Sequence, residues 1–185
     1  MLRRGYTVAT LEYTLAPYTA YPTPVVQAVS ALNHIINNAS SLQIDETKVI
    51  IGGDSAGAQI ASQVCSLVTN ETLRTKMGIE VDLSAQQLKG AMFNCGVYDI
   101  ESLPECEFPF GGTFLWAYTN TYHYQEFEGK NEFSTVKNIT SAFPKTYLTD
   151  GDSDWLLPQT ILLKEKLEEK GVPVMSYLPE NKGLV

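Results

Sequence analysis

The chain carries a serine in a setting that can make it a nucleophile. Ser55 stands at the centre of Gly53-Asp54-Ser55-Ala56-Gly57, a G-x-S-x-G motif. The apolar run Val49-Ile50-Ile51 precedes the motif, and the helical stretch from Ala58 to Val68 follows it. This arrangement is the signature of a nucleophile elbow, a strained turn that presents the serine hydroxyl at the carboxyl edge of a sheet. We expect the glycines at both ends of the motif to relieve the crowding at such a turn.

A nucleophilic serine also needs a base for its proton and donors for the oxyanion that forms. One donor is expected inside the motif, because the backbone N–H of Ala56 would open a helix whose dipole favours negative charge. A nucleotide-binding loop is a competing interpretation, but the run from Gly52 to Ala58 fits neither G-x-G-x-x-G nor a phosphate loop ending in Gly-Lys-Ser or Gly-Lys-Thr. An ordinary strand-to-helix turn is the other alternative, and the flanking pattern favours the elbow over it.

A group of carboxylates provides candidates for the acid that orients the base. In the usual chain order for this motif the acid follows the serine. Three aspartates follow the predicted strand that ends at Leu148: Asp150, Asp152 and Asp154. We favour Asp154, since the apolar residues after it would shield its carboxylate from water. Asp150 and Asp152 remain alternatives, and turn formation or helix capping is the structural explanation for the group.

The base is absent from the place where it is expected. The two histidines, His34 and His123, both precede Asp154. We interpret His34 as a surface or boundary residue of a helix and His123 as a packed or exposed loop residue among aromatic side chains. The sequence therefore contains no complete Ser-His-Asp triad.

Strands and helices alternate along the chain. We predict strands at 6–13, 48–52, 88–95, 142–148 and 172–178 and helices at 22–36, 58–68 and 158–170. This alternation calls for an α/β fold with a parallel sheet, right-handed crossovers and helices on both faces. We predict one domain over 1–185, in which the aromatic-rich segment 96–135 is an insertion that lines a pocket or packs as a lid.

Composition excludes several classes of partner. The formal net charge is −8 and no basic stripe offsets it, so we expect no nucleic acid partner. Cys65, Cys95 and Cys106 lack metal-ligand spacing, and we favour reduced thiols, with a Cys95–Cys106 disulfide as the alternative. No run approaches the ~20 apolar residues of a membrane span. We expect no cofactor, no metal and no membrane span in this chain, and a cytoplasmic location unless an anchor or signal precedes it.

The chain resembles the hormone-sensitive-lipase-like branch of the α/β-hydrolases over nearly all its length. The matching segments are the run from Tyr13 to Pro17 with Tyr21-Pro22, the G-x-S-x-G motif, Asp150 to Leu156, and Gly171 to Val174. The resemblance implies hydrolysis of small carboxylic esters without a cofactor. It also implies Ser55 as the nucleophile, Asp154 as the triad acid and Ala56 as an oxyanion donor.

The sequence departs from this family in several places. Thr14 stands where arginine is usual and Ala58 where a further glycine is common. The family's His-Gly-Gly loop would lie before the strand at 6–13, and its triad histidine would follow the strand at 172–178, where 179–185 contains no histidine. Without the strand that feeds the His-Gly-Gly loop, a one-strand gap would separate 6–13 from 48–52. Those strands could close up, or another segment could fill the gap, or the chain could be part of a longer protein, which we favour.

Two functions are therefore weighed. The first is a serine carboxylic ester hydrolase that works through an acyl-enzyme on Ser55, with this chain as a fragment of little activity alone. The second is a non-catalytic α/β-hydrolase relative that acts as a binding or scaffold protein. The intact elbow favours the enzyme, because a binding protein has no need of the serine.

Overall fold

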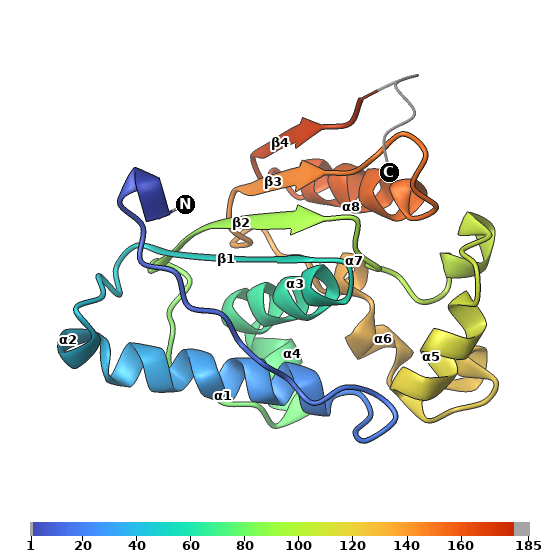
Figure 1. The fold of residues 1–185 in the computed structure, drawn as a ribbon, viewed down its shortest axis with the longest axis horizontal. Helices are drawn as coiled ribbons and strands as arrows, with labels where there is room; N and C mark the ends of the chain where they lie inside the picture. The colour runs from blue at the N-terminus through green and yellow to red at the C-terminus, as the bar shows by residue number, and fades with distance from the viewer. Residues whose placement is uncertain (1, 180–185) are drawn as a thin grey trace.

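A computed structural model describes residues 2–179, and a four-stranded sheet forms its centre (Figure 1). The strands are β1 (Val49–Asp54), β2 (Leu88–Asn94), β3 (Thr146–Thr149) and β4 (Val174–Tyr177). They lie in the order β1-β2-β3-β4, and every neighbouring pair is parallel. The predicted α/β fold with a parallel sheet is confirmed, and the strand predicted at 142–148 forms only in its second half.

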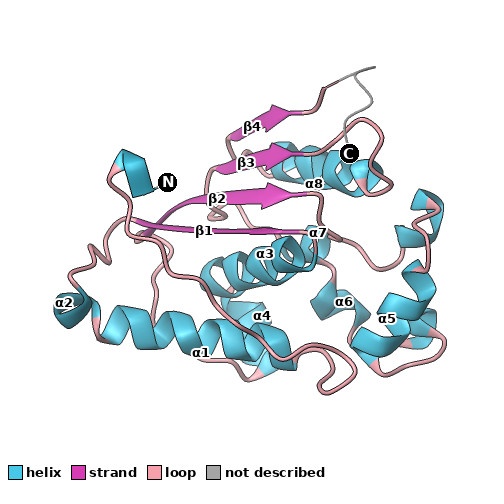
Figure 2. Cartoon of the chain, viewed as in Figure 1, coloured by secondary structure: helices cyan, strands magenta, loops and turns pink. Residues whose placement is uncertain are grey.

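Helices connect the strands, as the colouring of Figure 2 shows. The α-helices are α1 (Thr23–Asn37), α2 (Ala39–Leu42), α3 (Ala56–Thr69), α4 (Glu71–Met77), α5 (Gly111–Thr119), α6 (Lys130–Phe133), α7 (Thr135–Asn138) and α8 (Leu157–Glu169). Short 3-10 turns are η1 (Leu2–Arg4), η2 (Leu103–Cys106) and η3 (Tyr124–Glu126). Within the described residues no helix combines the length and apolar character needed to cross a bilayer.

The core lies between the sheet and helices α3 and α8. Helix α3 is buried almost throughout, because small and apolar residues allow it to lie close to β1 and β2. Phe93 of β2 and Leu148 of β3 point into this layer and are fully buried. Leu163 and Leu167 of α8 complete it on the side of β3 and β4. Burial of such side chains stabilises the fold by about 1.5–3 kcal/mol each.

The two faces of the sheet differ. Parallel pairing in register puts Gly53, Phe93 and Leu148 on the core face. The other face carries Met175 and Tyr177, which are 70% and 52% exposed. Helices on both faces were expected from the alternation of elements, but in the described residues only one face has helices packed on it.

The strand predicted at 6–13 is wrong. This segment is extended and exposed up to Glu12, Tyr13 is half-buried, and no residue of it pairs with a strand in the described structure. It runs past β1 towards the loop before α1, where the backbone N–H of Thr14 donates to Gln27 Oε1 at 2.9 Å. The residues of this segment have high β propensity, but a strand also needs a neighbour whose backbone pairs with its own. As a result β1 is an edge strand.

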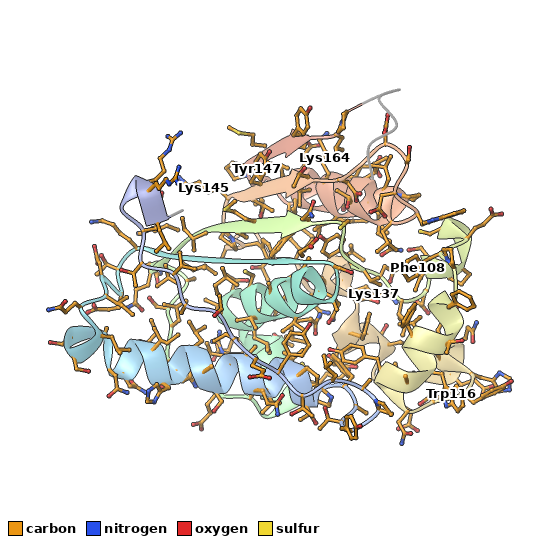
Figure 3. The ribbon with its side chains drawn as sticks, in the orientation of Figure 1. Phe108, Trp116, Lys137, Lys145, Tyr147 and Lys164 are labelled. Carbon is orange, nitrogen blue, oxygen red and sulfur yellow. The ribbon has the colours of Figure 1, made fainter. Side chains whose placement is uncertain are left out.

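The aromatic-rich segment 96–135 lies beyond the carboxyl ends of the strands. It contains α5, α6 and the short turns η2 and η3, and Phe108 and Trp116 lie on this side of the molecule (Figure 3). Phe108 stacks on Phe114 with a centroid distance of 5.8 Å, and Trp116 meets Tyr122 edge to face at 5.4 Å. The segment therefore stands beside the sheet edge at which β1 turns into α3.

Candidate active site

Ser55 occupies a strained corner between β1 and α3. Its backbone has φ 53° and ψ −120°, a conformation that residues with a side chain rarely adopt. The corner is held by a hydrogen bond from Ser55 N to Asn94 O at 2.9 Å, which extends the pairing of β1 with β2. The side chain of Ser55 is exposed. These are the features expected of a nucleophile elbow.

Only one of the two motif glycines is required by crowding. A Cβ atom at Gly53 would lie 2.2 Å from the carbonyl oxygen of Gly57, so any side chain there would push the helix away from the strand. A Cβ atom at Gly57 would meet nothing within 4 Å. The expectation that both glycines relieve a clash is therefore correct for position 53 and wrong for position 57.

The backbone at the start of α3 offers donors beside Ser55. Ala56 is the first residue of the helix and is exposed. In the described chain its N–H has no acceptor, as expected for a first-turn amide. Unpaired amides at a helix start attract negative charge. An oxyanion formed near Ser55 Oγ would meet such a donor.

The end of β2 adds a polar cluster that the sequence analysis did not single out. Asp54 Oδ1 accepts hydrogen bonds from Asn94 Nδ2 at 2.6 Å and from Cys95 Sγ at 3.2 Å. Cys95 has φ 36°, another positive value at a residue other than glycine. A usable signal was present, since Asn94 and Cys95 end a predicted parallel strand, and carboxyl ends of such strands share one edge of the sheet.

The loop after β3 contains the candidate acids. Asp154 is half-buried, and its Oδ1 accepts a hydrogen bond from Leu156 N at 2.8 Å. Asp150 is buried, and both of its carboxylate oxygens have partners, Gly151 N and the hydroxyl of Thr160. Asp152 is half-buried in the turn between them. The turn explanation therefore holds for one oxygen of Asp154, although no side chain caps the start of α8, whereas both oxygens of Asp150 are already hydrogen-bonded.

Electrostatics link the three strand ends. Burial raises the pKa of Asp150 to about 6, opposed by the hydroxyl of Thr160 and assisted by the negative charges of Asp154 and Asp54. Burial and the hydrogen bond to Asp54 raise the pKa of the Cys95 thiol to about 12, with smaller contributions from Asp154 and Asp150. The carboxylates that follow β1 and β3 therefore lie within electrostatic range of the thiol that follows β2. In the described structure no hydrogen bond joins Ser55 to Asp154.

Neither histidine contacts these groups. His34 is exposed on α1, and its ring lies against the side-chain amide of Asn38. His123 is exposed before η3 and meets the ring of Tyr122 edge to face at a centroid distance of 4.9 Å. Both positions agree with the structural interpretation of these residues. The described residues include no imidazole hydrogen-bonded to Ser55 or Asp154.

The cysteines remain single, and no cluster of metal ligands is present in 2–179. Cys65 and Cys106 are buried and Cys95 is half-buried, all as thiols. No group of three or more histidine, cysteine or carboxylate side chains in this part of the chain could hold a metal ion. The candidate site therefore consists of the serine corner, the β2 end and the acid loop.

The sequence profile of the α/β-hydrolase fold family matches residues 3–182. The chain belongs to this family. This match supports the hormone-sensitive-lipase-like branch that the sequence resembles.

Curated relatives cover most of the chain at low identity. A protein of Acanthamoeba polyphaga mimivirus named as an alpha/beta hydrolase is 24% identical over 183 residues, which are 94% of this chain and 50% of that relative. The esterase LipQ of Mycobacterium tuberculosis is 24% identical over 96% of this chain and 42% of its own length. Isoprenylcysteine alpha-carbonyl methylesterase of Arabidopsis thaliana is 26% identical over 85% of this chain and 38% of its own length. The chain spans about half the length of the curated relatives it matches, or less.

Solved structures support the same fold. Esterase B from Lactobacillus rhamnosis matches with a TM-score of 0.77 and 18% identity, covering 91% of this chain and 53% of that one. Esterase LipW from Mycobacterium marinum matches with a TM-score of 0.72 and 18% identity, covering 90% of this chain and 51% of that one.

Proposed function

We propose that this chain is the central portion of a serine carboxylic ester hydrolase in which Ser55 is the nucleophile. The observation that carries the proposal is the Ser55 corner, whose positive φ strains the backbone at an exposed hydroxyl. Strain of this kind costs of order 1–3 kcal/mol and persists at functional sites. A purely structural turn at this position would favour glycine, which adopts the same backbone without strain.

The proposed reaction begins with attack by Ser55. A base takes the hydroxyl proton as Oγ bonds to the ester carbonyl carbon, and the Ala56 N–H stabilises the oxyanion. The bond to the alcohol oxygen then breaks, and the alcohol leaves with the proton returned by the base. Water hydrolyses the acyl-enzyme, releasing the carboxylic acid and restoring Ser55 Oγ–H.

Asp154 is proposed as the acid that orients the base. One of its oxygens has no partner in the described chain, and it could accept an imidazole N–H. Asp150 is the weaker candidate because both of its oxygens are already bonded. The base itself is proposed to be a histidine outside these 185 residues, because neither His34 nor His123 contacts the site. The chain alone is then a fragment with little activity, since loss of the base removes activation of the serine.

The second candidate is a binding protein that retains the fold without chemistry. The lack of a histidine beside Ser55 in the described structure favours it. The two candidates differ in one respect that can be measured, which is whether Ser55 Oγ becomes acylated when a base is supplied.

The test is chemical rescue of the chain by imidazole. The chain is incubated with p-nitrophenyl acetate, with and without imidazole, and acyl transfer is followed by intact mass and by mass spectrometry of the peptide containing Ser55. We expect imidazole to increase acetylation of Ser55. The corresponding peptide of Ser55→Ala should stay unlabelled. Ser41→Ala, which alters an exposed serine of α2, should label as the parent does.

A result in which Ser55 and Ser41 are acetylated at equal low rates would reject the nucleophile assignment and favour the binding protein. Asp154→Asn should leave the imidazole-rescued rate unchanged in this fragment, because free imidazole is not held by the protein. In a longer protein that supplies its own histidine, the same variant should lose activity by several orders of magnitude.

A further inference from the structure

Asn94 makes two hydrogen bonds to consecutive residues of the Ser55 corner. Its backbone carbonyl accepts a hydrogen bond from Ser55 N at 2.9 Å, and its side-chain Nδ2 donates to Asp54 Oδ1 at 2.6 Å. Asn94 is the last residue of β2 and stands opposite Asp54, the last residue of β1. One residue of the neighbouring strand therefore holds both the backbone and a side chain at the point where β1 ends.

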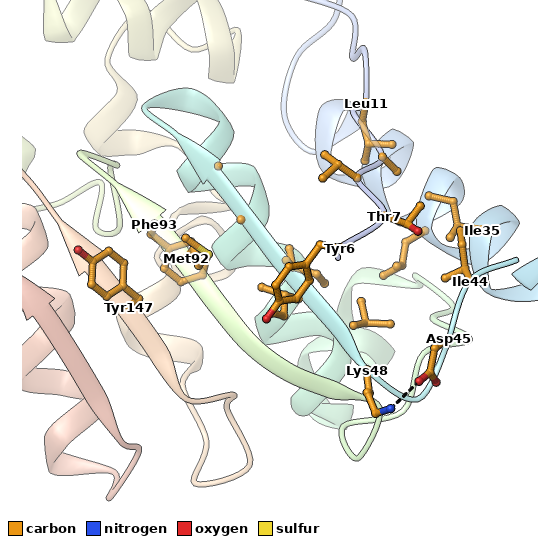
Figure 4. A pocket seen from close by; sticks show the side chains of 18 of the residues that line it. Tyr6, Thr7, Leu11, Ile35, Ile44, Asp45, Lys48, Met92, Phe93 and Tyr147 are labelled. Atoms are coloured by element: carbon orange, nitrogen blue, oxygen red, sulfur yellow. Dashed lines mark ion pairs between the residues drawn. The ribbon is translucent and has the colours of Figure 1, made fainter. Parts of the chain in front are cut away.

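The register of the sheet puts the side chains of Asp54 and Asn94 on the same face. Phe93 points into the core, so the next residue, Asn94, and its partner Asp54 lie on the opposite face. Asn94 and Met92 are among the residues that line a slot of about 460 Å³ between β1 and the segment 6–13 (Figure 4). The lining of the slot is largely apolar, so the amide of Asn94 needs a hydrogen-bond partner within the protein. Asp54 supplies it.

These contacts bear on the strain at Ser55, whose φ is 53°. A positive φ is relieved most simply by a flip of the preceding peptide group, which changes the ψ of one residue and the φ of the next together. Here that flip would turn Ser55 N–H away from Asn94 O. It would also twist the backbone of Asp54, whose side chain is held by the same residue. Asn94 therefore opposes the movement that would relax the corner.

A second donor reaches the same carboxylate oxygen. Cys95 Sγ lies 3.2 Å from Asp54 Oδ1, and the backbone of Cys95 is itself strained, with φ 36°. The N–H of Cys95 donates to Thr149 O at 3.2 Å, which fixes its position against the end of β3. The strained ends of β1 and β2 are thus joined through one carboxylate. Strained residues that their surroundings fix in this way are typical of functional sites.

We propose that Asn94 is a positioning residue for the Ser55 nucleophile, acting through the Asp54 carboxylate and the Ser55 N–H. The inference rests on the proposed function, because it assigns a role in the same site. An amide–carboxylate hydrogen bond of 2.6 Å belongs to the strong, charge-assisted kind, and it lies one residue before the reacting hydroxyl. It keeps Oγ in the orientation needed for attack, since a displacement of about 1 Å at a reacting group can cost about 100-fold in rate.

The test exchanges the donor and the acceptor. Asn94→Asp removes the donor and places two carboxylates opposite each other on neighbouring strands. The double variant Asp54→Asn/Asn94→Asp restores the hydrogen bond with reversed polarity and keeps the net charge of the parent. Acetylation of Ser55 by p-nitrophenyl acetate is measured with imidazole present. We expect the rate to fall about 10- to 100-fold in Asn94→Asp and to return to within about threefold of the parent in the double variant.

A matched pair elsewhere in the molecule separates positioning from stability. Asn37, at the end of α1, donates from Nδ2 to Asp82 Oδ2 at 2.7 Å, which is the same kind of hydrogen bond between exposed residues. Asn37→Asp repeats the charge repulsion at that place. Urea unfolding gives the folded fraction of each variant, so that rates are compared for the folded protein. We expect Asn37→Asp to acetylate Ser55 at the rate of the parent.

A second measurement does not depend on acylation. NMR backbone couplings and chemical shifts of Ser55 report the sign of its φ. We expect a positive φ in the parent, in the double variant and in Asn37→Asp, and a shift of the population towards negative φ in Asn94→Asp. If Ser55 is not acetylated even in the parent, the esterase proposal fails, and these couplings still decide whether Asn94 holds the corner.

Three results would overturn the inference. The first is acetylation and φ unchanged from the parent in Asn94→Asp. The second is an equal loss of rate in Asn94→Asp and Asn37→Asp, which would make the effect one of general stability. The third is a double variant as slow as Asn94→Asp, which would show that the hydrogen bond is not the cause. If Asn94→Asp does not fold, Asn94→Ala, which removes the amide without adding a charge, is measured in its place.

Discussion

The two edges of β1 differ in whether their backbone hydrogen-bonding groups are paired. On the side of β2 the strand is paired along its length, and the pairing continues through Ser55 into the corner that begins α3. On the other side the backbone of Ile50 and Gly52 meets an apolar slot. Strand β1 thus leads into the fully formed Ser55 corner and has one edge that is unpaired in the described residues.

The comparison shows which features depend on local sequence. The Ser55 corner needs only the glycine at 53, the strand before it and the helix after it, all within about twenty residues of chain. Pairing of the outer edge would require a second strand, which the local sequence does not supply. The strained conformation of Ser55 therefore forms although the outer edge of β1 is unpaired in the described residues. The following predictions rank positions on the two sides by their expected effect.

The largest effect is expected at Gly53. Gly53→Ala places a Cβ atom against the carbonyl of Gly57, and because this contact is with backbone, the helix must move. We expect the free energy of unfolding in urea to fall by about 3 kcal/mol or more. The control is Gly57→Ala, which meets open space at the start of α3 and should change stability by less than about 1 kcal/mol. Equal losses in both variants would contradict the crowding seen at the corner.

The next effect concerns Asp150 and pH. Its pKa of about 6 lies above the ordinary value of 3.8, so the native state favours the protonated form. This contribution to stability is complete below about pH 4 and is lost as the pH rises through 6. Asp150→Asn should therefore gain stability relative to the parent over this range, by about 1–2 kcal/mol after allowance for solvent screening.

Urea unfolding at a series of pH values between 3.5 and 7.5 measures this difference. Asp45→Asn is the control, because hydrogen bonds from Thr47 and Lys48 lower the pKa of Asp45 to about 2. Stability from Asp45 is lost only as the pH falls below about 4, so that variant should show no trend between pH 4 and 7. A difference curve for Asp150→Asn that is flat with pH would reject the role of burial at this carboxyl.

A smaller effect is expected at Ser55 itself. Ser55→Gly removes the Cβ strain at positive φ, which costs about 1–3 kcal/mol, and adds the conformational entropy of glycine to the unfolded chain. We expect a net gain of about 1 kcal/mol in thermal or urea unfolding. Ser55→Ala retains the Cβ atom and should change stability by less than about 0.5 kcal/mol. If Ser55→Gly is the less stable of the two, the corner is not strained.

The smallest effect is expected in the segment 6–13, beside the unpaired edge of β1. Val8→Ala, in the segment 6–13, removes atoms that are 45% exposed and should cost less than about 0.5 kcal/mol in this chain. Val25→Ala in α1 is the matched control, because that side chain is fully buried and should cost about 2 kcal/mol. A large loss for Val8→Ala would mean that the segment is already packed in solution.

Sequence patterns predicted the parts of the fold that short-range rules determine. The helices around α1, α3 and α8 follow from apolar spacing and from proline or glycine at their ends, and the structure confirms them to within a few residues. The strand at 6–13 failed because β propensity describes a residue's fit to a pleated surface and cannot supply the neighbouring strand. The prediction of helices on both faces of the sheet failed for a similar reason. The alternation of elements indicates where helices begin, but not how many of them cover each face.

The candidate site was predictable to a similar degree. The corner at Ser55 was evident from glycine spacing, whereas the different roles of Asp150 and Asp154 depend on Thr160 and Leu156, partners that only the folded loop reveals. The contact of Asp54 with Cys95 joins residues 41 positions apart and has no local signature. Parallel topology predicts that the carboxyl ends of neighbouring strands lie close together. It does not predict which atoms form the hydrogen bonds between them.

The raised pKa of Cys95 has a chemical consequence for the neighbourhood of Ser55. Sulfur is intrinsically the better nucleophile, but only as thiolate, and a pKa of about 12 leaves almost none of it ionised at neutral pH. Electrophiles that reach this end of the sheet therefore encounter a protonated and unreactive thiol. Alkylating agents such as iodoacetamide should react with it slowly. Burial and, to a lesser extent, the carboxylate of Asp54 thus protect the sulfur from oxidation and adduct formation, so the thiol does not compete with the nearby hydroxyl of Ser55.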